Sequence, residues 1–268
     1  MSEKDVYTHG HSDAVLRSHR SRTAANSAAY LVPLLEPGMR LLDVGCGPGT
    51  LTADLARIVA PGEVVGVDVS AEVVEEARSF AADAGVKSVS FLAGDFREAG
   101  LEPGSFDVVH AHQVLQHVTD PIGSLAAMKS LAKPGGIVAA RDSVYSSFGW
   151  YPTDPRLDRW LKIYLAVTKR NGADADAGTR LRAWAQAAGF TDITAGSSTW
   201  TWATPDTCTW WGELWADRTV GPGLGAQAVE YGISTTDELA DIATAWRAWA
   251  AHDDATIVVV HGELLARA

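Results

Sequence analysis

Cysteine is scarce in this 268-residue sequence, which has only Cys46 and Cys208, far apart along the chain. We therefore expect no structural disulfide. No apolar run is long enough to cross a bilayer, and the first residues are polar rather than signal-like. The sequence thus predicts a cytoplasmic protein that is not inserted in a membrane. No internal repeat stands out, which argues against the repeat architectures.

Basic residues are also few: 22 lysines and arginines stand against 33 aspartates and glutamates, a formal net charge of −11. An enzyme of nucleic acids needs a basic face to neutralise phosphates, so this balance argues against such a partner. Apolar side chains, in contrast, make up 47% of the residues. Over this length they are enough for one substantial core with an appended cap.

A glycine-rich loop follows the first predicted strand. The strand, Met39 to Val44, carries Asp43 and runs into a G-x-G-x-G segment at residues 45–49, followed by a predicted helix from Thr50 to Val59. Glycine lets a ligand lie against bare backbone, and the free N–H groups of the helix start then face that ligand. A dinucleotide site would have the spacing G-x-G-x-x-G. The carboxylate of Asp43 suits a ligand with an ammonium group better than a pyrophosphate.

The next predicted strand, Glu63 to Val69, has Asp68 near its carboxyl end. An acid about 20 residues after the glycines is placed to accept hydrogen bonds from the ribose hydroxyls of an adenosine. Asp68 could instead cap the helix predicted from Ser70 to Ala82. Because Ser70 can cap that helix itself, we favour the ribose role.

Three further segments complete an ordered series of motifs. With the two above, they read LDVGCGPGT, VVGVDVS, LAGDF, FDVVHAHQVLQHV and LAKPGGIVAARD, and they cover residues 40–142. In this order the chain resembles class I S-adenosylmethionine (SAM)-dependent methyltransferases, in particular the ubiquinone/menaquinone-biosynthesis subgroup. The Asn/Asp-Pro-Pro-Tyr/Phe motif of methyltransferases that act on nucleobase amines is absent, since residues 111–114 read Ala-His-Gln-Val.

The resemblance implies an α/β fold: a Rossmann-like, seven-stranded, mostly parallel sheet with an N-terminal helix and a helical lid formed by C-terminal insertions. It implies SAM as cofactor, with S-adenosylhomocysteine as product. The methionine part would lie against the glycine loop and the end of the fourth strand, the ribose at the second strand, the adenine after the third, and the carboxylate near the N-terminal helix. The resemblance assigns the methionine part to Gly45, Cys46, Gly47, His112 and Gln113, and the ribose to Asp68 and Val69. It assigns the adenine to Asp95 and Phe96 and the carboxylate to Arg22.

Three regions are expected along the chain. Residues 1–38 would form an N-terminal cover with a helix from about Ser12 to Leu35, interrupted near Pro33, and residues 39–143 the SAM-binding core. Residues 144–268 would hold two lid insertions, 144–178 and 205–252. They would also hold a closing antiparallel pair of strands at 190–203 and 255–265.

All ten tryptophans fall between residues 150 and 249. Tryptophan is favoured where flat or aromatic ligands are enclosed, but it also fills ordinary cores. Trp184, Trp246 and Trp249 recur at helical spacings and are expected simply to pack. The tryptophans in or beside the insertions are candidates for an acceptor pocket, with packing as the open alternative: Trp150, Trp200, Trp202, Trp210, Trp211 and Trp215.

Three residues are candidates for a catalytic base. His117 has a suitable intrinsic pKa, although similar sequences carry histidine there whatever their substrate. His19 shares a predicted helix face with Arg22. In related enzymes the N-terminal helix folds over the cofactor, so the resemblance implies that His19 or Tyr7 could face the acceptor, with a solvated polar face as the open alternative. His9 and His11 have no carboxylate partners, and we expect no metal.

The sequence therefore predicts a methyltransferase acting on an oxygen or carbon of an apolar, aromatic or quinone-like small molecule. An N-methyltransferase of small amines is the alternative within the class, since tryptophans can also hold cations. A SAM-binding protein without transfer activity is the alternative outside it. The loop spacing disfavours an NAD-dependent oxidoreductase. The sequence does not predict the oligomeric state.

Overall fold

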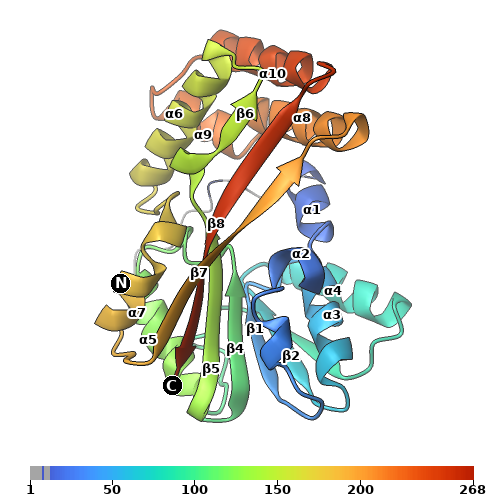
Figure 1. Ribbon diagram of the computed structural model, residues 1–268, viewed down its shortest axis with the longest axis vertical. Helices are drawn as coiled ribbons and strands as arrows, with labels where there is room; N and C mark the ends of the chain where they lie inside the picture. Colours follow the sequence, from blue (N-terminus) through green and yellow to red (C-terminus); the bar gives the residue numbers. More distant parts are fainter. Residues whose placement is uncertain (1–7, 9–12) are drawn as a thin grey trace.

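The computed structural model describes Thr8 and residues 13–268 (Figure 1). Helices and strands alternate through the first half, and helices dominate the second. The helices are α1 Asp13–Arg20, α2 Ala24–Ser27, α3 Thr50–Val59, α4 Ala71–Asp83, α5 Pro121–Leu131, α6 Pro155–Arg170, α7 Leu181–Ala187, α8 Pro205–Val220, α9 Leu224–Glu230 and α10 Thr236–Ala250, with 3-10 turns Val32–Leu34, Tyr145–Ser147 and Ala177–Thr179. The strands are β1 Leu41–Val44, β2 Val64–Asp68, β3 Val89–Ala93, β4 Phe106–His112, β5 Ala132–Ser143, β6 Gly149–Tyr151, β7 Ile193–Trp202 and β8 Thr256–Arg267.

One sheet organises the molecule. Its first five strands are parallel in the order β3-β2-β1-β4-β5, and β8 then pairs with β5 in the antiparallel sense. β7 pairs with the other edge of β8 along its whole length, from Ile193 opposite Ala266 to Trp202 opposite Ile257. This is the predicted Rossmann-like, mostly parallel sheet. The three-residue β6 is an additional strand that the sequence did not indicate.

Apolar residues of the inner parallel strands β1, β2, β4 and β5 are buried on both faces, whereas the edge strand β3 is largely exposed. In β1, Leu41 packs with residues of α2 and α3, whereas the next residue, Leu42, packs on the opposite face with residues of α5 and α7. The period-2 alternation of side chains along a strand sends them to opposite faces. The sheet is thereby held between two helical layers.

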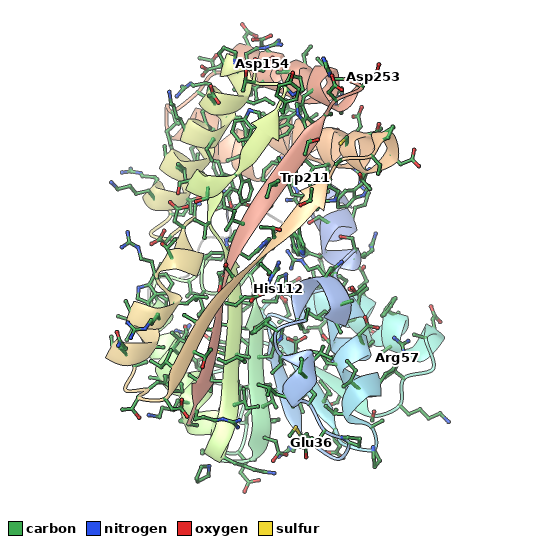
Figure 2. All side chains as sticks on the ribbon, in the orientation of Figure 1. Glu36, Arg57, His112, Asp154, Trp211 and Asp253 are labelled. Atoms are coloured by element: carbon green, nitrogen blue, oxygen red, sulfur yellow. The ribbon has the colours of Figure 1, made fainter. Side chains whose placement is uncertain are left out.

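The lid has an apolar core of its own, above the carboxyl end of the sheet (Figures 1 and 2). Helices α6, α8, α9 and α10 surround this lid core, in which Trp160, Trp215 and Trp246 are almost completely buried. Trp160 meets Trp215 and Trp246 edge to face, with ring centroids 4.5 and 5.0 Å apart. Such pairs add to the stability gained from burial alone. Several of the tryptophans therefore hold the lid together.

Strand β8 belongs to both the sheet and the lid. Its second half, residues 261–267, pairs with β5, while residues 256–258 pair with β6 on the same edge. Ile257 and Val259 are buried in the lid core, and Leu264 and Ala266 in the core of the sheet. The β7–β8 ribbon thus runs from the core directly into the lid (Figure 1).

The N-terminal helix differs from the prediction. In place of one helix from Ser12 to Leu35, the chain forms α1, α2 and a 3-10 turn. Thr23 caps α2 by accepting from the backbone N–H of Asn26, and the Asn26 amide donates to the carbonyl of Ser21. Short polar side chains that bond to nearby backbone compete with a continuous helix. In the part of the chain that the structure describes, no helix combines the length and apolar character needed to cross a membrane.

Candidate active site

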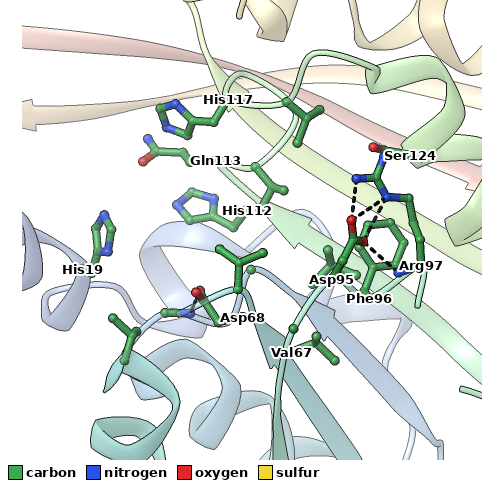
Figure 3. A pocket seen from close by; sticks show the side chains of 18 of the residues that line it. His19, Val67, Asp68, Asp95, Phe96, Arg97, His112, Gln113, His117 and Ser124 are labelled. Carbon is green, nitrogen blue, oxygen red and sulfur yellow. Dashed lines mark hydrogen bonds and ion pairs between the residues drawn. The ribbon is translucent and has the colours of Figure 1, made fainter. Parts of the chain in front are cut away.

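The principal cavity, here called the main cavity, has a volume of ≈190 Å³ and opens at the carboxyl ends of β1, β2 and β4 (Figure 3). This is where open α/β sheets bind ligands. The cavity brings together most of the residues that the sequence singled out for the cofactor. They are Arg22, Gly45, Gly47, Asp68, Val69, Asp95, Phe96, His112 and Gln113, joined by His19 and His117.

The glycine loop gives the main cavity a wall of backbone. Gly45 and Gly47 have φ values of 67° and 55°, in the left-handed region that favours glycine. A side chain on Gly45 would collide with Val114, whereas one on Gly47 would point into open space beside His19. A ligand can therefore lie directly on the Gly47 backbone. Cys46 is buried and lines a smaller cavity of ≈10 Å³ along this loop, here called the loop cavity, where burial raises the pKa of its thiol.

Asp68 is fixed by two backbone groups. It accepts from the N–H of Gly47 at 3.0 Å and from the N–H of Ser70 at 3.0 Å. Ser70 itself caps α4 by accepting from Val73, so Asp68 is not the helix cap. The next residue, Val69, exposes 75% of its surface beside the main cavity. An exposed apolar side chain next to a fixed carboxylate fits a ligand with a flat ring and adjacent hydroxyls.

Asp95 carries a partner that the sequence reasoning missed. Arg97 donates from Nε and Nη2 to both oxygens of Asp95, at 2.5–3.0 Å (Figure 3). These bonds hold the pKa of the Asp95 carboxyl below its usual range. A carboxylate has room for further donors, so Asp95 can still accept from an amino group in the cavity. Phe96 lines the same end.

His112 is the most unusual polar group of the main cavity. Its side chain is 3% exposed, and neither ring nitrogen has a hydrogen-bond partner in the described part of the chain. Trp200 meets its ring edge to face at 5.7 Å. Burial, followed by the charges of Arg22 and Arg141, lowers the pKa of His112 well below its usual range, so the ring is neutral. Buried nitrogens normally have partners. A bound ligand can supply one here.

Gln113 connects several elements. Its backbone has φ 55°, a strained value for a residue other than glycine. Its amide nitrogen donates to Ser143 Oγ and His261 Nε2, both at 2.9 Å, and its amide oxygen accepts from Arg22 Nη2. Arg22, on the segment after α1, is thereby tied to the carboxyl ends of β4 and β5. Strain of this kind is concentrated at functional sites.

The sequence position of Asp43 had indicated a carboxylate that is available to an ammonium group of the ligand. In the structure both carboxylate oxygens already have protein partners. One carboxylate oxygen accepts from Thr52 Oγ1 at 2.6 Å, and the other lies 2.8 Å from His110 Nδ1. The side chain is almost completely buried, and it reaches the wall of the loop cavity. Its first task is therefore to join β1 to α3 and β4 beneath the glycine loop.

A third cavity, of ≈30 Å³, lies between the segment after α1, the end of β7 and α8. We call it the aromatic cavity because Tyr145, Phe148, Trp200, Trp211 and Trp215 line it. Its volume is enough for about two water molecules, so a larger molecule must widen it. Four residues line both the aromatic and the main cavity and mark their junction: His19, Arg22, Gln113 and His117.

The six candidate tryptophans are not all at this cavity. Trp200, Trp211 and Trp215 line it. Trp202 stacks on Trp211 with ring centroids 3.9 Å apart, and Trp150 meets Trp160 edge to face, so both contribute to packing. These two and Trp210, whose ring centroid lies 6.1 Å from that of Trp211, line none of the three cavities. Trp200 and Trp202 are two residues apart and share one face of β7, so strand alternation could not separate the ring that lines the cavity from the ring that packs.

The candidate bases differ in their surroundings. His19 is half-buried and lines all three cavities. His117 Nε2 accepts a hydrogen bond from the side-chain amide nitrogen of Gln116 at 3.0 Å, and burial together with Arg22 and Arg218 lowers the pKa of His117 to about 3. Tyr7 lies outside the described residues, as do His9 and His11. Among the described residues, no group of three or more histidine, cysteine and acidic side chains could hold a metal ion.

Sequence reasoning missed Arg218, Ser143 and His261, which complete the junction and the aromatic cavity. These residues carry no local motif, and they reach the junction from the end of β5, from β8 and from α8.

Comparison with known proteins gives the class of this fold and site. Residues 35–187 match the family model described as a methyltransferase domain, which is more than half of the chain. The chain belongs to this family. More narrowly, it is a class I SAM-dependent methyltransferase, an enzyme that uses SAM as its methyl donor.

Among its relatives, the chain is 31% identical to an uncharacterized methyltransferase of Schizosaccharomyces pombe over 79% of both chains. It is 30% identical to the probable methyltransferase ltbC of Aspergillus luteorubrus, over 97% of this chain and 96% of the relative. A ubiquinone biosynthesis O-methyltransferase of Xanthomonas campestris is 42% identical, but over only 37% of this chain and 41% of its own length.

Two solved structures share the fold. The YcgJ protein from Bacillus subtilis has a TM-score of 0.59 at 17% identity, covering 91% of this chain and 98% of its own. The cyclase SpnF has a TM-score of 0.52 at 20% identity, covering 96% and 86%. At these identities the likeness concerns the fold alone.

Proposed function

We propose that this enzyme transfers a methyl group to an oxygen or carbon of an apolar, aromatic or quinone-like small molecule bound in the aromatic cavity. The observation that carries the proposal is the junction at His19, Arg22, Gln113 and His117, where the aromatic cavity meets the main cavity. Partial similarity to a ubiquinone biosynthesis O-methyltransferase supports the same class of acceptor.

The residues of the main and loop cavities fit SAM. Asp68 would accept from the ribose hydroxyls, Asp95 and Phe96 would contact the adenine, and Gly47 and His112 would line the methionine part. Arg22, which lines the loop cavity as well, would pair with the carboxylate. When bound, SAM supplies an electrophilic methyl group on a positively charged sulfonium.

Positioning is the main contribution of the protein to this chemistry. Holding two reacting atoms in line can contribute roughly 7–11 kcal/mol at best. The aromatic rings of Trp200, Trp211 and Trp215 would fix the plane of the acceptor, and the junction residues would direct its nucleophilic atom toward the main cavity. The lid core and α1 would exclude water from both.

An acceptor that must lose a proton needs a base, and the structure favours His19 over His117 for that role. With a pKa of about 3, His117 is neutral but a weak base near neutral pH. His19 lies at the junction of all three cavities. We therefore propose His19 as the base where one is needed and His117 as a residue that lines and shapes the junction.

Two alternatives remain to be tested. A small amine could be held by the aromatic rings through cation–π contact. The chain could also bind SAM without transferring its methyl group: the cyclase SpnF has this fold, and a fold does not define an activity.

The first test is calorimetric titration of the purified protein with S-adenosylhomocysteine, NAD and NADP. Binding of S-adenosylhomocysteine alone supports the proposal, whereas binding of NAD or NADP alone contradicts it. The second test incubates the protein with SAM and a metabolite collection and searches by mass spectrometry for products heavier by one methylene unit. Protein with the Asp68→Ala substitution is the control for products that do not depend on the cofactor site. Products from amines only would favour the first alternative, and tight SAM binding without any product the second.

A further inference from the structure

The hydrogen-bond partners of the Gln113 amide leave it only one orientation. Its oxygen accepts from Arg22 Nη2, and a guanidinium can only donate, so the oxygen must face Arg22. The amide nitrogen then faces Ser143 Oγ and His261 Nε2, at 2.9 Å from each. Each of its two hydrogens therefore has one acceptor, and a flip of the amide would set its nitrogen against the guanidinium, donor against donor.

The same bond fixes the position of the proton on His261. An amide N–H can only donate, so Nε2 of His261 accepts and carries no proton. The side chain is completely buried, and burial together with the charges of Arg141 and Arg22 lowers the pKa of His261 to about 2, so the ring is neutral. A neutral imidazole keeps one proton, which must then be on Nδ1. His261 thus faces Gln113 as an acceptor.

Both acceptors stand on strands of the sheet. Ser143, the last residue of β5, lies directly opposite His261 of β8, and the Cβ atoms of such cross-strand partners are about 5 Å apart. His261 is also opposite Ser198 of β7, so β8 is paired on both edges at this point. Trp200 meets the His261 ring edge to face at 4.4 Å. The two acceptors are therefore held at a fixed spacing that fits the two hydrogens of one amide.

His261 is connected to the ligand site through Gln113. It lines none of the three cavities, whereas Gln113 lines the main and aromatic cavities and Arg22 lines all three. The hydrogen bonds run from His261 and Ser143 to the amide nitrogen of Gln113, and from the amide oxygen to Arg22. They end at the residue to which the proposed function assigns the cofactor carboxylate.

We propose that His261 and Ser143 are positioning residues for the cofactor: as a pair of acceptors they orient the Gln113 amide, whose oxygen holds the Arg22 guanidinium for the cofactor carboxylate. This inference rests on the proposed function, because it takes Arg22 as the partner of that carboxylate. A guanidinium that is held in place before the ligand arrives loses less conformational freedom on binding, which adds affinity. The same bonds offset the strained backbone of Gln113, with its φ of 55°.

The test compares two ligands that differ only in the carboxylate: S-adenosylhomocysteine and decarboxylated S-adenosylhomocysteine, which keeps the adenosine, the thioether and the ammonium group. Each is titrated calorimetrically into the full-length protein. We expect the wild-type protein to bind S-adenosylhomocysteine about 10-fold or more tightly than the decarboxylated compound, the gain of hydrogen bonds to a charged group. Arg22→Gln should bind the two compounds alike.

Three variants assign this preference to the acceptor pair. His261→Phe keeps an aromatic ring without the acceptor nitrogen, and Ser143→Ala removes the hydroxyl. Each should lose most of the preference by weakening S-adenosylhomocysteine alone. His261→Gln can offer its amide oxygen in place of Nε2 and should keep most of the preference. Ser198→Ala is the matched control, because it removes a neighbouring hydroxyl that bonds to Arg141 and not to Gln113, and it should behave like the wild-type protein.

Long-range proton–nitrogen NMR of the wild-type protein tests the position of the proton directly. The signals of His261, assigned by their absence from the spectrum of His261→Gln, should show a proton on Nδ1 and none on Nε2 at neutral pH. A histidine that only fills space in the sheet has no such requirement. A proton on Nε2 would contradict the orientation of the Gln113 amide and would overturn the inference.

Two results of the titrations would also overturn the inference: an equal loss of affinity for both compounds in His261→Phe and Ser143→Ala, which would assign these residues to the fold, or an intact preference in both variants. Loss of the preference in Ser198→Ala would assign it to the β7–β8 ribbon as a whole, with the same consequence. Failure of the proposed function looks different. A wild-type protein that binds both compounds alike would refute the assignment of Arg22 itself, and an intact preference without any methylated product in the screen would refute methyl transfer alone.

Discussion

Replacing Asp68 by alanine distinguishes a ligand-binding carboxylate from a structural one. The side chain accepts from the backbone N–H groups of Gly47 and Ser70, each at 3.0 Å, and it also lines the main cavity. If Asp68 had a purely structural role, it would accept only these two hydrogen bonds. A ribose would add two hydroxyl donors to the same two oxygens, which have room for them.

The expected loss of affinity follows from the charge of the acceptor. A hydrogen bond to a charged group contributes about 1.5–3 kcal/mol, which corresponds to about a 10–150-fold change in the dissociation constant. We expect Asp68→Ala to weaken binding of SAM and of S-adenosylhomocysteine alike by this amount, since both carry the same ribose. Asp68→Asn keeps one oxygen but replaces the other by an amide donor, so its loss should be smaller.

Calorimetric titration with S-adenosylhomocysteine measures this loss, and urea unfolding of the same variants measures stability. Ser70→Ala is the matched control, because it removes the cap of α4, worth about 0.5–2 kcal/mol of stability, without touching the cavity oxygens. It should lower stability and leave the affinity unchanged. If Asp68→Ala behaves like Ser70→Ala, the carboxylate only braces the glycine loop, and its assignment to the ribose is refuted.

Three further predictions concern the histidines and the lid. His19→Ala should lower kcat by about 10²–10⁴-fold with SAM binding preserved, and it should remove one limb of the pH–rate profile. His117→Ala should instead weaken SAM binding or lower the stability of the fold. The reverse pattern would transfer the role of base to His117. Trp211→Ala should raise the KM for the acceptor but leave SAM affinity intact. Because Trp211 is buried and stacked on Trp202, the substitution should also lower the free energy of unfolding by about 3–5 kcal/mol in urea unfolding. Unaltered stability would contradict the place of Trp211 in the lid core. Acid should destabilise the fold, because burial lowers the pKa of His117 to about 3 and that of His261 to about 2. From about pH 6.5 downward the unfolded chain therefore binds protons that the folded chain does not. Each histidine then lowers the free energy of unfolding by up to about 1.4 kcal/mol per pH unit. Asp142, whose pKa burial raises to about 7, gains its proton first in the folded state and opposes this loss of stability. Asp142→Asn should therefore steepen the fall in stability between about pH 7 and pH 4, whereas an unchanged fall would show that the buried carboxyl is ionised in the folded state.

The parallel part of the fold could be predicted from sequence because its signals are local. Each strand from β1 to β4 is a short apolar run that ends in a glycine turn, an acid or a polar pair, and those ends meet at one edge of the sheet. The ordered motifs therefore placed Asp68, Asp95 and His112 around one cavity without any knowledge of long-range contacts. The β7–β8 pair followed in the same way from two apolar or alternating runs.

The acceptor side could not be predicted in this way, because it depends on contacts between distant segments. Gln113 meets His261, and Arg218 meets Ser18, and no spacing in the sequence indicates either pair. The tryptophans show the same limit. Trp211 and Trp215 face both a cavity and the lid core, so packing and binding were not the separate alternatives that the sequence had suggested.

The shared strand β8 restricts how this enzyme can acquire a new acceptor. Strand β8 is hydrogen-bonded to β5 at one end and to β6 at the other. The lid therefore cannot be replaced by exchanging its two insertions alone. A chimera that takes its lid helices from a relative must also take the halves of β7 and β8 that lie next to the lid. These halves include Trp200 and the β7–β8 register that orients its side chain. Directed evolution should therefore proceed faster by point substitutions on α8 and at the end of β7 than by exchange of whole segments.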